Sequence, residues 1–136
     1  MNKGERNEQM FGKRFNIEIN DIPNKKFNEG SDTMNGISLK SFRFSVPATI
    51  KITERTEENF KLLINDHLRN SHSRCYCITI RNKYYFMSKR LFGKAIEKFG
   101  YFDNDSKANG GKIKIRCGST LKMAKWLTLQ GINGIE

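Results

Sequence analysis

Three basic residues near the carboxy-terminal end alternate with isoleucines: Lys112, Lys114 and Arg116. In an extended strand every second side chain projects from the same side, about 7 Å from the next. This distance is close to the spacing of successive phosphates along one nucleic-acid strand. The row therefore predicts a strand whose outer side contacts a phosphate backbone.

Four more basic residues flank a predicted hairpin and complete the nucleic-acid-binding set that we expect: Arg81, Lys83, Lys89 and Arg90. Basic residues at 94, 98, 122 and 125 would extend the set if their helices border the same surface. Residues 74–126 hold 13 of the 25 Lys and Arg residues and only three acids, whereas residues 1–73 hold 12 basic and 10 acidic residues. This regional excess is larger than solubility requires. The sequence thus predicts a polyanionic partner. The simpler interpretation is that these charges form a solvated face of a lysine-rich protein.

Nucleic acid, either DNA or RNA, is the partner that this pattern favours, with contacts to phosphates and weak sequence preference. The alternative is a protein-interaction module or inhibitor that docks on an acidic host protein surface. A basic surface would serve this equally well, because electrostatic steering of a partner needs only a complementary electrostatic potential. The richness in Lys, Asn and Ile is typical of an AT-rich genome. A regulatory role in a phage or other mobile element would fit this composition.

A small ribonuclease is a further alternative, in which His67 or His72 acts as the general base. Nearby arginines would stabilise a phosphate in such a site: Arg69, Arg74 and Arg81. The sequence places no second catalytic group beside either histidine. We therefore predict a protein that is not an enzyme, with no catalytic residues and no cofactor.

His67, His72, Cys75 and Cys77 are zinc-compatible ligands within eleven residues. Their H-x4-H-x2-C-x-C spacing is not that of a standard site, and two cysteines separated by one residue on a strand present their sulfurs poorly to one ion. We predict no metal and interpret the cysteines as small core residues.

An odd number of cysteines argues against a disulfide framework. The first ten residues contain no apolar segment like that of a signal peptide. No apolar run approaches the roughly 20 residues that a membrane-spanning helix needs. These observations predict a cytoplasmic protein that makes no membrane contact, and they leave its oligomeric state open.

The length of 136 residues is that of one domain. We predict a flexible amino-terminal arm over 1–14 and a single α+β domain over 15–136, with Asn82 and Lys83 forming a tight turn and Ser88 capping a helix. Apolar periodicity places the elements. The expected strands are 15–19, two between 37 and 53 that break near Pro47, 74–81, 84–87 and 112–117; the expected helices are 56–70, 89–99 and 120–130, with polar loops at 24–36 and 101–112.

The order of the elements from residue 42 to 117 matches the split βαβ, ferredoxin-like arrangement, with a carboxy-terminal helix added. This order predicts an α+β fold with an antiparallel sheet and about three helices; an α+β sheet of another topology is the competitor. Tyr84, Tyr85 and Phe86 would occupy the third strand, where RNA-recognition domains of this order stack bases. The segment lacks the glycine-containing consensus of those domains, and we expect most of these rings to be buried.

Overall fold

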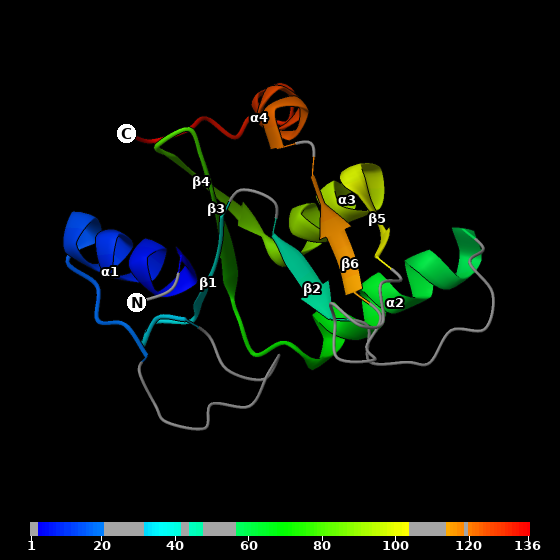
Figure 1. Ribbon diagram of the computed structural model, residues 1–136, viewed down its shortest axis with the longest axis horizontal. Helices are drawn as coiled ribbons and strands as arrows, with labels where there is room; N and C mark the ends of the chain where they lie inside the picture. The colour runs from blue at the N-terminus through cyan, green and yellow to red at the C-terminus, as the bar shows by residue number, and fades with distance from the viewer. Residues whose placement is uncertain (1–2, 21–31, 42–43, 48–56, 104–113, 119) are drawn as a thin grey trace.

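The computed structural model describes residues 3–20, 32–41, 44–47, 57–103, 114–118 and 120–136 (Figure 1). These residues form an α+β fold, as the sequence predicts. The helices are α1 (Lys3–Phe15), α2 (Glu57–Asn70), α3 (Lys89–Phe99) and α4 (Thr120–Leu129). The strands are β1 (Ile37–Lys40), β2 (Ser45–Pro47), β3 (Cys75–Ile80), β4 (Lys83–Ser88), β5 (Gly100–Asp103) and β6 (Lys114–Cys117).

The strands divide between two sheets of three strands each. The first has the order β1-β3-β4, with β1 parallel to β3 and β4 antiparallel to it. The second is antiparallel and has the order β2-β6-β5. The ferredoxin-like order is therefore not confirmed, and the first sheet is mixed where an antiparallel sheet was expected. The apolar alternation changes phase at Lys40 and Ser41, which is where the chain leaves one sheet for the other.

The hairpin of β3 and β4 follows its local sequence closely. Arg81 and Asn82 both have positive φ, 50° and 64°, as a tight turn between twisted strands requires. The turn thus lies one residue earlier than predicted. The hydroxyl oxygen of Ser88 accepts a hydrogen bond of 3.1 Å from the Leu91 amide, which confirms the predicted cap of α3.

Helix α1 lies where the sequence predicts a flexible arm. Its Phe11 is fully buried and its ring centroid lies 4.8 Å from that of Phe15, one turn away. The two rings pack on Tyr84 and Phe86 of β4. The arm was expected because residues 1–14 are polar and carry mixed charge, but one aromatic pair on the same helical face suffices to dock the helix.

The remaining differences concern short segments. The strand expected over 15–19 is reduced to one bridge, between Ile19 and Thr33. The polar loop expected from residue 101 instead begins as β5, which starts directly at Gly100 and pairs with β6. The strand expected near 50–52 and most of the two polar loops lie outside the described residues.

Both faces of the first sheet are covered, which explains the burial of adjacent strand residues. Tyr84 and Cys77 face α1, whereas Tyr85 and Tyr76 face a larger core that includes α3 and the second sheet. Neither tyrosine of β4 is free to stack a base on an open sheet, so the expectation that these rings are buried is confirmed. Among the described helices, none has the length and apolar character needed to cross a membrane.

An aromatic stack joins the two sheets into one core. The ring of Phe92 from α3 lies against Tyr76 of β3 with 4.0 Å between centroids and 9° between planes. On another side it stacks with Phe44, just before β2, at 5.7 Å. All three side chains are buried, so this stack fixes α3 against both sheets.

Candidate nucleic-acid interface

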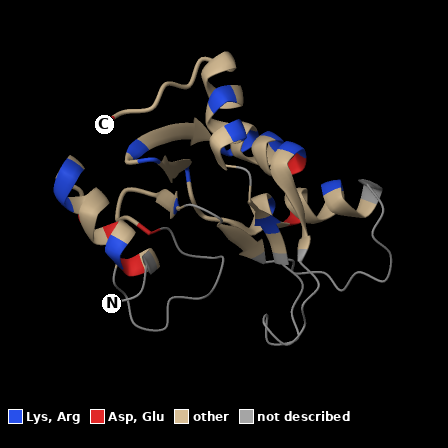
Figure 2. Ribbon diagram, turned by 45° about the horizontal axis from the view of Figure 1, so that its top comes forward, with Lys and Arg blue, Asp and Glu red and all other residues tan. Residues whose placement is uncertain are grey.

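Basic side chains dominate the second half of the described chain. Residues 74–102, 115–118 and 120–136 contain ten Lys and Arg residues and two acids, Glu97 and Glu136. Figure 2 shows these basic positions along α3, on α4 and at the β3–β4 hairpin. Glu97 pairs with Lys61 of α2 at 3.4 Å, and Glu136 lies 4.0 Å from Lys83. Both pairs are exposed and contribute little to stability, so the positive potential of this half is largely retained.

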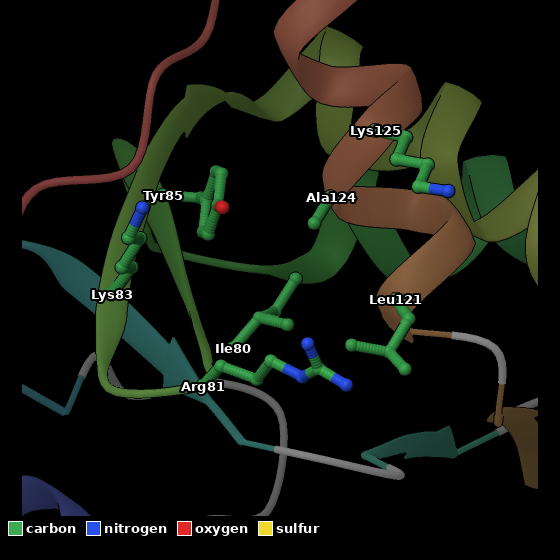
Figure 3. Close-up of a pocket in the computed structure, with 7 residues that line it drawn as sticks. All are labelled: Ile80, Arg81, Lys83, Tyr85, Leu121, Ala124 and Lys125. Atoms are coloured by element: carbon green, nitrogen blue, oxygen red, sulfur yellow. The ribbon is translucent and has the colours of Figure 1, made fainter.

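The hairpin brings two of the predicted residues together. Arg81 and Lys83 are exposed at the turn and, together with Lys125 of α4, line a pocket of about 360 Å³. Lys125 is one of the residues that the sequence offered as an extension of the basic set. Sequence reasoning missed the apolar lining of this pocket, although Leu121 stands at helical spacing from both Ala124 and Lys125, three and four residues before them. Figure 3 shows how the hairpin and α4 contribute the lining residues.

Lys89 and Arg90 lie at the other end of β4, away from the hairpin turn. Six strand residues separate the two ends by roughly 17–20 Å. Lys89 donates a hydrogen bond of 2.8 Å to the Ser71 carbonyl oxygen, just after α2. Arg90 is exposed and lines a second, smaller pocket between α2 and α3, together with Lys94. The predicted residues thus form two groups, and Lys89 has a structural role in joining α2 to α3.

Helix α3 carries a row of exposed basic residues that starts at Arg90. Lys94 and Lys98 follow at intervals of four, which places all three on one side of the helix. The opposite side of α3 is buried in the core. Helix α4 packs beside α3 through Phe99 and Trp126, whose ring centroids are 5.9 Å apart. The row of α3 and the exposed lysines of α4 therefore belong to neighbouring helices.

The alternation of buried and outward-facing residues that was predicted for the basic strand is confirmed at one position. Ile115 and Cys117 are fully buried, while Arg116 between them faces outward and is partly exposed. Arg116 lies directly opposite Tyr101 of β5 in the ladder, and the Tyr101 ring is 53% exposed. Lys112 and the side chain of Lys114 lie outside the described residues, so the full row of three remains a prediction.

The two histidines have different surroundings. His67 is buried, with 5% of its surface exposed, whereas His72 is exposed. Burial, followed by the positive charge of Lys40, lowers the pKa of His67 to about 4; Lys89 also lowers it and Asp66 opposes the shift. His67 is therefore neutral at pH 7, and its burial keeps it from reaching a phosphodiester at the surface.

This pKa makes a testable contribution to stability. The folded state holds His67 unprotonated down to about pH 4, while the unfolded chain protonates near 6.5. The contribution of His67 to the free energy of unfolding is therefore complete above pH 6.5. It is lost as the pH falls from 6.5 to 4, by about 3 kcal/mol at most. In His67→Leu this contribution should disappear. Urea unfolding at several pH values should show the wild type losing more stability than the variant over this window, with His72→Leu as the control; parallel curves would contradict the assignment.

The three cysteines are free and belong to the core or its edge. Burial raises the pKa of Cys77 and of Cys117 to about 12, and that of Cys75 is also raised, mainly by burial. Their thiols stay protonated at neutral pH, which agrees with their interpretation as packing residues. Among the described residues, no three His, Cys, Asp or Glu side chains are grouped so that they could hold a metal ion.

Comparisons with family models, curated proteins and solved structures find no match to this chain.

Proposed function

We propose that the protein binds nucleic acid, by phosphate contacts from exposed Lys and Arg side chains of the β3–β4 hairpin, α3 and α4. The observation that carries this proposal is the excess of ten basic over two acidic residues in the described residues 74–102, 115–118 and 120–136. Such an excess favours a polyanion, because each phosphate neutralised by Lys or Arg releases condensed counterions.

The spacing on α3 supports phosphate contacts in particular. Residues four apart on a helix are separated by about 6 Å along its axis, so Arg90, Lys94 and Lys98 can follow the phosphates of one strand. Contacts of this kind position a protein without reading sequence, and we expect weak sequence preference. The free thiols fit a reducing, intracellular compartment, where nucleic acid is available.

A matched pair of double variants tests the proposal. Arg90→Gln with Lys94→Gln removes two charges from the α3 row, and we expect roughly tenfold weaker binding of a labelled oligonucleotide. The slope of log K against log salt should become less steep by about 1.5 to 2, since each lost phosphate contact removes close to one unit. Fluorescence anisotropy at several salt concentrations measures both quantities.

The control is Arg6→Gln with Lys13→Gln, which removes the same charges from exposed positions of α1. Equal losses in the two variants would mean that net charge alone attracts the oligonucleotide. If the wild type binds no oligonucleotide at low salt but co-purifies with a protein after nuclease treatment, the basic surface serves an acidic protein partner and the proposal is wrong.

A further inference from the structure

The pocket between the β3–β4 hairpin and α4 combines two kinds of lining. Four of its lining side chains are apolar or aromatic: Ile80, Tyr85, Leu121 and Ala124. Basic side chains complete the lining: Arg81, Lys83 and Lys125. In Figure 3 the Tyr85 ring and Ile80 lie between the hairpin and α4, and Arg81 extends from the turn towards Leu121. Lys83 comes from the hairpin and Lys125 from α4, on opposite sides of these residues in the view.

This lining selects for a flat apolar body that carries negative charge beside it. The volume of about 360 Å³ is near the lower end of the 300–1,000 Å³ typical of ligand pockets. It suits one nucleotide and excludes a duplex. Among the described residues that line the pocket, none carries a carboxylate. Leu121, 45% exposed at the rim, and the planar guanidinium of Arg81 both offer surfaces on which a base can pack.

We propose that this pocket holds one unpaired nucleobase, with the flanking phosphates on Arg81, Lys83 and Lys125. The protein is then a single-strand binder, because the bases of a duplex are paired and stacked and reach such a pocket only if they are flipped out. This inference rests on the proposed function and adds to it the form of nucleic acid that the surface selects.

The carboxy-terminal segment holds this pocket in shape. The Tyr84 amide and carbonyl both pair with Ile135, at 2.8 and 2.9 Å. Gly134 lies so close that a Cβ atom there would be 2.8 Å from the Tyr85 ring and 2.9 Å from Lys83 Cβ. Tyr85 is consequently held in place and only 7% exposed. This side of the pocket is therefore already formed before a base binds. The Glu136 carboxylate beside Lys83 is exposed, and an incoming phosphate displaces it from that lysine.

The test compares strands that have the same phosphates but differ in their bases. Oligothymidylate of about 15 nucleotides, a length that spans the usual single-strand site, is compared with an abasic strand of equal length and with a duplex. Wild-type protein is expected to bind oligothymidylate at least about fivefold more tightly than the abasic strand, because stacking of one base provides about 1 kcal/mol or more.

A variant that fills the pocket without altering charge locates the effect. Ala124→Leu adds bulk to the apolar lining and should bring the affinity for oligothymidylate down to that for the abasic strand, while binding of the abasic strand is unchanged. Gln130→Leu adds the same side chain at an exposed position after α4 and should retain the wild-type ratio. The thermal unfolding midpoint of each variant confirms that it is folded.

Equal affinities of the wild type for oligothymidylate and the abasic strand overturn the inference and leave phosphate binding intact. A retained preference for bases in folded Ala124→Leu also overturns it, because the base then binds elsewhere. Failure of all three nucleic acids to bind at low salt removes the proposed function itself. The wild-type comparison requires no variant, so the inference is testable even if Ala124→Leu does not fold.

Discussion

Replacing Phe92 by alanine is expected to lower the free energy of unfolding by about 3–5 kcal/mol. Phe92 is fully buried and stacks on Tyr76 on one side and on Phe44 on the other. The substitution removes the ring that contacts both Tyr76 and Phe44 and leaves a cavity in the core. Because whole domains are stable by only about 5–15 kcal/mol, the variant should unfold at much lower urea concentration, as followed by circular dichroism.

Leu129→Ala is the control for this loss. Leu129 also lies on a helix, but it is 83% exposed, and its truncation should change stability by no more than about 0.5 kcal/mol. A loss below about 1 kcal/mol in Phe92→Ala would show that the stack is not a connection between the sheets, since cavity formation at a fully buried ring costs more than that.

Phe11→Ala should have the second largest effect, a loss of about 3 kcal/mol. Phe11 is the fully buried residue of α1, and its ring contacts Phe15, Tyr84 and Phe86. Its removal should release α1 from β4, so hydrogen exchange should accelerate in α1 before it accelerates in β3. Mass spectrometry of exchanged peptides measures this order.

The neighbouring Met10, 56% exposed, provides the control. Met10→Ala should leave both the stability and the exchange of α1 near wild type. If Phe11→Ala also has no effect, residues 3–15 behave as the flexible arm that their polar composition first suggested, and the packing of α1 on the sheet contributes nothing.

Sequence periodicity was sufficient to predict those elements whose burial depends on residues close in the chain. The hairpin turn was predicted to within one residue, and the cap at Ser88 and the apolar side of α3 were predicted as they are found, because each depends on residues that are close in sequence. The parallel pairing of Ile37 with Cys75 was not predicted, since no local pattern encodes which distant segment a strand joins. Helix α1 was missed for the related reason that Phe11 acquires its importance only from β4.

In the predicted site, too, the placements that depend on local sequence were correct and those that depend on distant segments were not. Arg81 and Lys83 were correctly placed next to one another, because a tight turn brings them together. Lys89 and Arg90 were assigned to the same region, but the length of β4 carries them to its far end. The pocket depends on α4 packing across the hairpin, so neither its apolar wall nor the role of Lys125 within it could be deduced from spacing alone.

The pairing of Ile135 with Tyr84 has a consequence for self-association. A strand at the border of a sheet presents unpaired amides and carbonyls that can recruit a strand from another molecule. Here the Tyr84 amide and carbonyl are already satisfied by Ile135, and Arg14 of α1 donates two hydrogen bonds to the Glu136 carbonyl oxygen, at 2.6 and 3.1 Å. The chain thereby covers part of this edge strand with its own residues. A neighbouring copy could add a strand at Tyr84 only after displacing them.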